Sequence, residues 1–508
     1  MRNILKKAVT VICCACLVLS IPCTSPSGRV EAQTLQESEA GPSCRIVDWQ
    51  NVELKVYFAT LPESDDGYFH VVAMNTYEYE ITPSAEFVAS KAMNHDMKFR
   101  FPLNHGKSNT RLYQKFGVAV KQQGKFVLIT EPQYISNPEY LAYKTRERPK
   151  TTSKKGLLLD NANGIDLGVQ HYITNMHAET GMCMTNILDA KGVKNVVVLN
   201  PWTENQDWIN PLSRDNKKAN YYMFNASDAK GVKLLADSFR LYATAYDYDN
   251  WIIGNEINAR NPWNYTKYVP VEQYTREYMQ AFRVMYTAIK SVNANAEIFI
   301  SLDQNWNRDL NAAKTYYDAR DVLECFNNMI ISGGNIDYGV AFHPYPAPLY
   351  WAKVWDMAKV GNQYASLIQH TPGSPVVSFQ NLHVLTDWLR QTQYLNPKGN
   401  PRKVILSEIG LNSRQGEDVQ AAALVYAYVA AESDDLVESI IFSRGNDDRK
   451  EMKDNMDFGL MRMDGTPKIS YQIFKTMDTD GGEQCMNYAK NVIGISNWSQ
   501  VIYGASYE

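Results

Sequence analysis

The feature that most constrains the fold is a series of short, continuous apolar runs that recurs through the last two thirds of the chain. Such runs are typical of strands buried on both faces, as in a parallel sheet. Amphipathic segments with helical spacing separate them, for example around Phe239 and around Phe282. The runs are Val196–Leu199, Trp251–Ile253, Ile298–Ile300, Val340–Phe342, Val404–Leu406 and Ile440–Phe442.

This alternation of strands and helices over residues 151–478 predicts an α/β fold, a (β/α)8 TIM barrel. The first strand is expected at Gly156–Asp160, and the second, Val169–Ile173, is expected to end in Thr174-Asn175. An open doubly wound sheet is the alternative, and it would require a glycine-rich phosphate loop after its first strand. Neither G-x-G-x-x-G nor a P-loop occurs in the sequence, which favours the barrel.

The chain before the barrel has a different pattern. Val52–Phe58 alternates between apolar and polar residues, and Phe116–Val120 and Phe126–Ile129 are separated by a turn at Gly124. Residues 33–150 are therefore predicted to hold a small antiparallel β domain and a polar linker. Residues 479–508 are expected to form a C-terminal tail.

The first residues have the three-part layout of a secretory signal peptide. Basic residues precede the apolar stretch Ala8–Ile21, and Val30-Glu31-Ala32 offers a small-residue cleavage site. An uncleaved anchor is the alternative, but the apolar stretch is shorter than the roughly 20 residues that span a bilayer. We therefore expect a signal peptide over residues 1–32, a secreted or cell-surface protein, and no membrane span in the mature chain.

Charge and cysteine content exclude several classes of partner. The 51 basic and 55 acidic residues leave a net charge of -4 and no dominant basic patch, so a nucleic-acid partner is not expected. Beyond the signal segment the cysteines show no CxxC spacing, and no H-E-x-x-H motif occurs, so neither a metal site nor another cofactor is expected. The disulfide pairing stays open for the remaining cysteines, which are Cys44, Cys183, Cys325 and Cys485.

Candidate catalytic residues follow three of the predicted barrel strands. Asn255-Glu256 follows the fourth strand, Glu408 follows the seventh, and His343-Pro344-Tyr345 follows the sixth. Because parallel barrel strands end at one rim, these side chains are expected to project toward the same mouth.

Two carboxylates across a cleft are what retaining glycoside hydrolysis requires. One attacks the anomeric carbon, and the other protonates the leaving oxygen and later deprotonates water. The acid must be neutral at the working pH, so burial or a neighbouring charge is expected to raise its pKa. A carboxyl separation of about 5–5.5 Å is expected for retention, against roughly 6.5–9.5 Å for inversion.

These motifs resemble the signature of the clan A (β/α)8 glycoside hydrolases, and the resemblance covers roughly residues 155–478. It implies that Glu256 is the general acid/base and Glu408 the nucleophile. It also implies that Tyr345 contacts the nucleophile, that Asn255 bonds the sugar 2-hydroxyl, and that His343 belongs to the substrate site. More narrowly, the chain resembles an uncharacterised bacterial family of secreted clan A-like barrels with an N-terminal β domain.

The sequence departs from the clan where many members end strand eight with a Trp, because here Phe442-Ser443 is followed by Arg444. Arg444 could bind the carboxylate of an acidic sugar, but a salt bridge with Asp447 or Asp448 is favoured. Trp263 follows the acid/base and is a candidate for stacking on a sugar. Trp202, Tyr265 and Trp306 are further candidates, and for all four aromatics core packing is at least as good an explanation.

The predicted function is therefore hydrolysis of an oligo- or polysaccharide with retention, by a two-glutamate mechanism. The alternative from another class is a non-catalytic carbohydrate-binding protein that keeps a glycosidase-like barrel. Loss of either glutamate would favour that alternative, and both glutamates are present.

Overall fold

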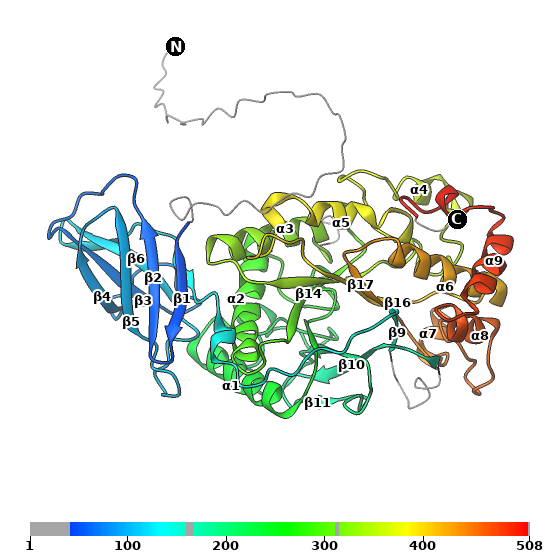
Figure 1. Ribbon diagram of the computed structural model, residues 1–508, viewed down its shortest axis with the longest axis horizontal. Coiled ribbons are helices and arrows are strands. Elements are labelled where there is room, and N and C mark those ends of the chain that lie inside the picture. The colour runs from blue at the N-terminus through cyan, green and yellow to red at the C-terminus, as the bar shows by residue number, and fades with distance from the viewer. Residues whose placement is uncertain (1–40, 159–166, 310–313, 506–508) are drawn as a thin grey trace, which may run out of the picture. The chain divides into compact units, whose positions relative to one another are not determined.

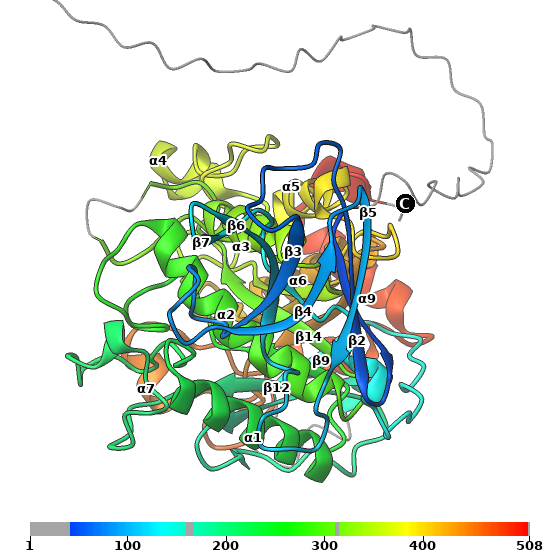
Figure 2. The same ribbon diagram turned by 90° about the vertical axis from the view of Figure 1, so that its left-hand side faces the viewer.

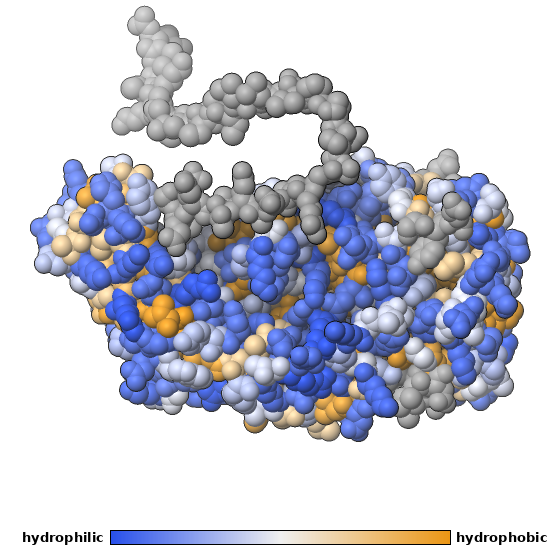
Figure 3. Space-filling model, viewed as in Figure 1, coloured by the Kyte–Doolittle hydropathy of each residue, from blue (hydrophilic) through white to orange (hydrophobic). Residues whose placement is uncertain are grey.

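The computed structural model describes residues 41–158, 167–309 and 314–505, which hold a β domain followed by a barrel (Figure 1). The predicted signal peptide, residues 1–32, lies outside the described residues. In the part of the chain described, no helix is both long and apolar enough to cross a membrane. On the face drawn in Figure 3, most residues are hydrophilic and the hydrophobic ones form small separate groups.

The N-terminal β domain consists of two antiparallel sheets that enclose one core (Figure 2). The first sheet has the order β1-β2-β5, and the second has the order β4-β3-β6-β7 with β8 beside β6. Apolar residues from both sheets, such as Leu54 and Val118, are fully buried between them. The strands are β1 (Ser43–Asp48), β2 (Asn51–Tyr57), β3 (Tyr68–Met74), β4 (Glu86–Ala92), β5 (Asp96–Pro102), β6 (Lys115–Gln122), β7 (Lys125–Leu128) and β8 (Gln133–Tyr134).

Eight parallel strands form a closed barrel, which confirms the predicted fold class. Each strand pairs with the next, and the eighth pairs with the first, so that the sheet has no edge. In order they are β9 (Lys155–Leu158), β10 (His171–His177), β12 (Val193–Leu199), β13 (Asn250–Ile253), β14 (Glu297–Asp303), β15 (Tyr338–His343), β16 (Val404–Ile409) and β17 (Val437–Phe442).

Alternate residues of each strand explain why the runs are continuously apolar. Ile252, for example, lies in the cluster that fills the barrel interior, whereas its neighbours Trp251 and Ile253 lie in the large cluster outside it. Both faces of the sheet are thus removed from water, and a polar residue on either face would be costly.

Helices cover the barrel from the third strand onward. The long helices α1 and α2 bury the residues whose spacing predicted them, including Phe239 and Phe282. The helices are α1 (Ala229–Ala245), α2 (Val271–Lys290), α3 (Ala319–Ser332), α4 (Asn362–Ala365), α5 (His383–Leu389), α6 (Glu417–Glu432), α7 (Arg449–Lys453), α8 (Ile469–Thr476) and α9 (Gly482–Ile493).

The second strand was predicted wrongly at its end. β10 continues through Thr174 to His177, because Asn175 and His177 keep pairing with β12 beyond the predicted boundary. Within residues 167–199 no α-helix follows β10; the short strand β11 (Met182–Cys183) turns back on it instead.

Candidate active site

Glu256, His343 and Glu408 all lie at the carboxyl end of the barrel strands. Glu256 follows β13 by three residues, and His343 is the last residue of β15. Glu408 lies in β16 at a bulge, where Leu406 and Ile409 pair with Ile440 and Phe442 of β17. A bulge inserts one extra residue into a strand and redirects its side chains. Here the bulge affects the direction in which the Glu408 side chain projects from β16.

Glu256 is the more enclosed of the two glutamates. Its Oε1 shares a hydrogen bond of 2.9 Å with Nδ1 of His343, and its side chain is 12% exposed. The pKa of Glu256 is raised to about 7. Burial is the largest cause, the charges of Asp303 and Glu408 act in the same direction, and the hydrogen bond from His343 opposes them. A carboxyl group with this pKa holds a proton near neutral pH, as a general acid must.

His343 is buried beside this carboxyl group. Burial on its own lowers the pKa of an imidazole. Here the hydrogen bond to Glu256 and the negative charges of Glu408, Glu256 and Asp303 outweigh burial and raise the pKa of His343. His343 therefore contacts the predicted acid/base directly, and the charge of the predicted nucleophile also acts on it.

Glu408 is held by a tyrosine hydroxyl. Tyr345 donates its hydroxyl to Oε1 of Glu408 at 2.8 Å, which matches the contact that the clan resemblance implied. Burial and the charge of Glu408 raise the pKa of Tyr345 well above its usual value, so the hydroxyl keeps its proton and remains a donor. The second carboxylate oxygen of Glu408 is not part of this bond.

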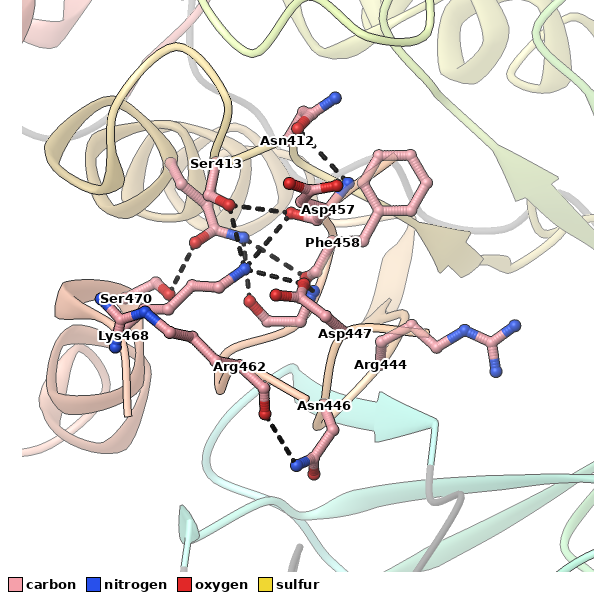
Figure 4. A network of polar contacts seen from close by, with 12 residues as sticks. Asn412, Ser413, Arg444, Asn446, Asp447, Asp457, Phe458, Arg462, Lys468 and Ser470 are labelled. Atoms are coloured by element: carbon pink, nitrogen blue, oxygen red, sulfur yellow. Dashed lines mark hydrogen bonds and ion pairs between the residues drawn. The ribbon is translucent and has the colours of Figure 1, made fainter. Parts of the chain in front are cut away.

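A buried ion pair between Lys468 and Asp447 joins the loops that carry Ser413 and Phe458 (Figure 4). Nζ of Lys468 lies 2.7 Å from Oδ1 of Asp447 and donates to Oγ of Ser413 at 2.9 Å. The same Asp447 oxygen accepts the N–H of Gly459 at 2.9 Å, which fixes the backbone beside Phe458. The ring of Phe458 lies 6.1 Å from the ring of Tyr345, so this network supports the residue that holds the nucleophile.

Gly410, two residues after Glu408, leaves room for Phe458. A Cβ atom added to Gly410 would lie 2.5 Å from Cδ2 of Phe458, a distance that real Cβ atoms do not show. A glycine at this position therefore allows the ring to approach the strand-seven loop closely.

Arg444 forms a salt bridge, but the predicted partners were wrong. Its Nε donates to both carboxylate oxygens of Glu451, at 3.0 and 3.1 Å. Asp447 is already engaged by Lys468, and Asp448 caps α7 by accepting the N–H of Lys450. Asp447 and Asp448 thus already have other partners, and Arg444 pairs with Glu451, about one helical turn further along the chain.

Trp263 lies beside a tyrosine that the sequence motifs did not identify. Its ring centroid is 5.7 Å from that of Tyr221, at an interplanar angle of 30°. Both rings are partly exposed, and Tyr221 packs against the cluster that fills the barrel interior. Burial raises the pKa of Tyr221, and the charge of Glu408 raises it as well.

The other aromatic candidates differ in exposure. Trp306 is fully buried and packs edge-on against Trp388, so it serves the core and is not available to a sugar. Trp202 and Tyr265 are partly buried, and both pack edge-on against Tyr222. Their contacts are those of ordinary packing.

Asn255 directly precedes the acid/base and is partly exposed. Among the described residues its side-chain amide makes no hydrogen bond, which leaves its donors and acceptor for a ligand. The sequence motifs did not identify Asp303. It lies at the end of a barrel strand, as Glu256 and Glu408 do, but no neighbouring motif distinguishes it from other acidic residues.

The described residues contain no group of three or more metal-ligating side chains close enough to hold an ion. The four cysteines are all free thiols in this part of the chain. The titratable groups gathered at this rim include the carboxyl groups of Glu256, Glu408 and Asp303, the imidazole of His343 and the phenol of Tyr345.

Comparison with protein families places the chain in one of them. The model of a family described as "Family of unknown function (DUF5722)" matches residues 180–501, which include every candidate catalytic residue. The chain belongs to this family. The search of curated proteins found no match.

Several solved structures are similar to this chain. A family 39 glycoside hydrolase from the gut symbiont Bacteroides cellulosilyticus WH2 is 14% identical, with 84% of this chain and 80% of that chain covered and a TM-score of 0.43. A β-glucuronidase from an uncultured Clostridium sp. is 13% identical, with 86% and 68% covered and a TM-score of 0.38. The β-D-glucuronidase of Dictyoglomus thermophilum is 13% identical, with the same coverage and a TM-score of 0.37.

Proposed function

We propose that the protein is a retaining glycoside hydrolase in which Glu256 is the general acid/base and Glu408 the nucleophile. One observation carries the proposal: two glutamates at the same rim occupy contrasting surroundings. The pKa of Glu256 is raised to about 7 by burial, whereas Glu408 accepts a hydrogen bond from Tyr345. A neutral acid opposite an ionised nucleophile is the pair that retaining hydrolysis needs.

The first half of the reaction follows from these positions. The oxygen of Glu408 that Tyr345 leaves free attacks the anomeric carbon, while Glu256 gives its proton to the departing glycosidic oxygen. The sugar is then bound to Glu408 as an ester, and Glu256 is ionised. His343 faces the carboxylate that has just formed, and its hydrogen bond to Oε1 stabilises that charge.

The second half reverses the proton transfer. Ionised Glu256 accepts a proton from water as the water attacks the anomeric carbon, and the bond to Glu408 breaks. The sugar leaves with its original configuration, and both glutamates regain their starting states. Each step uses only the groups gathered at the rim.

We further propose that Tyr221 and Trp263 form an aromatic wall for the sugar, in place of the strand-eight Trp that this chain lacks. Support comes from the paired, partly exposed rings of Tyr221 and Trp263 and from the charge of Glu408, which, beside burial, raises the pKa of Tyr221. Asn255 is proposed to bond a sugar hydroxyl, since its amide is otherwise unoccupied. For Arg444 the bidentate contact with Glu451 favours a structural role, so contact with a substrate carboxylate would require that pair to open.

Export of the protein is proposed on the sequence of residues 1–32 alone, where basic, apolar and small residues follow one another. N-terminal sequencing of the chain recovered from the culture medium tests it. A first residue at or near Gln33 is expected, and an intact N-terminus retained in the cell membrane would contradict it.

A substrate screen tests the enzymatic proposal. The purified protein and its Glu408→Ala variant would be assayed in parallel against aryl glycosides and a panel of polysaccharides. Release of sugar by the wild type alone would establish the activity and the substrate. If both proteins bound a glycan with equal affinity and neither cleaved it, the non-catalytic carbohydrate-binding function would replace this proposal.

A further inference from the structure

The backbone that carries Glu256 is unusual and needs external support. Its φ of 42° lies in the left-handed region, which non-glycine residues adopt infrequently. Such a conformation persists where the surrounding structure fixes it, and it is common at functional sites. The support here comes from the end of the neighbouring strand, β14.

Two residues of β14 hold the turn after Glu256. Ser301 accepts the N–H of Glu256 on its Oγ at 3.0 Å and the N–H of Ile257 on its carbonyl at 2.9 Å. Two residues further along both segments, Nδ2 of Asn258 donates to Oδ1 of Asp303 at 2.6 Å. In return, the N–H of Asp303 donates to Oδ1 of Asn258 at 2.9 Å. The turn is thus tied to β14 at three successive residues.

The carboxylate of Asp303 is buried, with 2% of the residue exposed. Asn305 completes its surroundings, with its N–H donating to Oδ1 at 2.9 Å and its Nδ2 donating to Oδ2 at 2.6 Å. Every one of these contacts donates to the carboxylate and so favours its ionised, acceptor-only form, against burial, which raises the pKa of Asp303. In the described part of the chain no lysine or arginine forms an ion pair with it.

This buried charge lies beside the catalytic pair. Asp303 and His343 are register partners on the neighbouring strands β14 and β15. The negative charge of Asp303 raises the pKa of His343 and of Glu256. The titratable and charged groups around the pair are Asp303, Glu408, Tyr316, Tyr345 and, through its bond to Asn305, Arg308.

We propose that Asp303 is a positioning residue for the acid/base: through Asn258 it locks the turn that carries Glu256, and its buried negative charge acts on the His343–Glu256 pair. The role rests on the proposed function of Glu256. With the negative charge of Asp303 in place, the His343–Glu256 pair keeps its proton near neutral pH, which Glu256 needs in order to act as an acid. Ser301 assists by fixing the left-handed residue itself.

The test measures the titration of His343 without any substrate. Histidines labelled with ¹³C at Cε1 would be followed by NMR from pH 4 to pH 9, and the His343 signal would be assigned by its absence in His343→Gln. The measurement is made in Glu256→Gln, so that only one member of the pair titrates. Asp303→Asn removes the charge and is expected to lower the midpoint by about one pH unit.

A matched control separates charge from local structure. Asn305→Ala removes a donor to Asp303 but keeps the charge, and it is expected to leave the midpoint unlowered. An unchanged midpoint in a folded Asp303→Asn protein, or an equal drop in Asn305→Ala, would overturn the proposal. If Asp303→Asn does not fold, Asn258→Ala in the otherwise wild-type protein decides the matter: it cuts the tie between Asp303 and the turn that carries Glu256 and is expected to lower the His343 midpoint, whereas an unchanged midpoint in that folded variant would overturn the proposal.

The same variants separate this inference from the proposed function. In an otherwise wild-type protein, Asp303→Asn is expected to move the alkaline limb of kcat/KM on an aryl glycoside to lower pH, by about one unit. A protein that cleaves no glycoside but shows the His343 shift would retain the inference about Asp303 while losing the function. Cleavage of a glycoside, with no shift of the His343 midpoint or of the alkaline limb in Asp303→Asn, would retain the function and overturn the inference about Asp303.

Discussion

The rim of the barrel holds two carboxylates that the fold treats differently. Glu256 lies against His343, with the charges of Asp303 and Glu408 nearby, and its proton is retained. Glu408 meets a hydroxyl donor from Tyr345, whose proton stabilises a carboxylate. We propose that one side-chain type receives two chemical roles here, and that the surroundings assign them.

The two halves of the site, the acid half around Glu256 and the nucleophile half around Glu408, also differ in how the backbone presents the carboxylate. Glu256 stands on a left-handed turn that is tied to β14, whereas Glu408 leaves β16 at a bulge and its partner Tyr345 is supported by Phe458. The acid half depends on hydrogen bonds to a neighbouring strand. The nucleophile half depends on packing and on the buried network around Lys468 (Figure 4).

The largest expected effect comes from removing the nucleophile. Glu408→Ala should lower kcat/KM on activated aryl glycosides by about 10⁴-fold or more, because no other group can form the ester. Steady-state kinetics on the substrate identified by the screen measures it. Glu417→Ala, which breaks an ion pair with Arg462 at the start of α6, is the control and should retain activity.

Removal of the acid should depend on the leaving group. Glu256→Gln should cost about 10²–10⁴-fold on glycosides with poor leaving groups and far less on activated ones, because only the former need a proton. Wild-type activity on poor leaving groups should fall as the pH rises through about 7, where Glu256 loses its proton. An equal loss on both kinds of substrate, with no alkaline limb, would remove the distinction between the two halves.

A smaller effect is expected from Tyr345→Phe, which deletes only the hydroxyl that binds Glu408. A hydrogen bond to a charged group contributes roughly 1.5–3 kcal/mol, so kcat should fall by about 10- to 100-fold. The matched control is Tyr426→Phe, which deletes a buried hydroxyl that binds the carbonyl of Val501 on another part of the barrel. If the control lost as much activity as Tyr345→Phe, the loss would reflect general destabilisation.

The smallest effect on catalysis is expected from the network behind the nucleophile. Lys468→Met leaves Asp447 buried without its cation and should lower the free energy of unfolding by about 3–5 kcal/mol. The folded variant should lose less activity than Tyr345→Phe, since Phe458 shifts but the hydroxyl remains. Denaturant unfolding and kinetics together check this, and an unchanged stability would show that the pair contributes little.

The barrel was predictable because burial on both faces leaves a plain signature. Ile252 faces the interior and Ile253 the helices, so neither could be polar, and the run of such residues marks a strand. The end of β10 was not predictable, because Thr174 and Asn175 are polar residues that continue a strand only through their pairing with β12. The missing helix after β10 left no comparable signal.

Within the site, the motifs pointed to Glu256, His343, Tyr345 and Glu408, which the structure brings together, but not to the residues that support them. Asn255-Glu256 and His343-Pro344-Tyr345 are short patterns that a sequence displays directly. Asp303 and Tyr221 come close to the glutamates only when strands and loops distant in the sequence meet. The partner of Arg444 was missed for a related reason, since Asp447 was already paired with a lysine twenty-one residues away.

The most direct test of the central claim is to trap the covalent intermediate. The protein would be incubated with a panel of 2,4-dinitrophenyl 2-deoxy-2-fluoro-glycosides, digested, and examined by mass spectrometry for a labelled peptide. The account predicts a label on Glu408, with no label in Glu408→Ala. A label on another carboxylate, or hydrolysis whose first product has the inverted configuration by NMR, would contradict it.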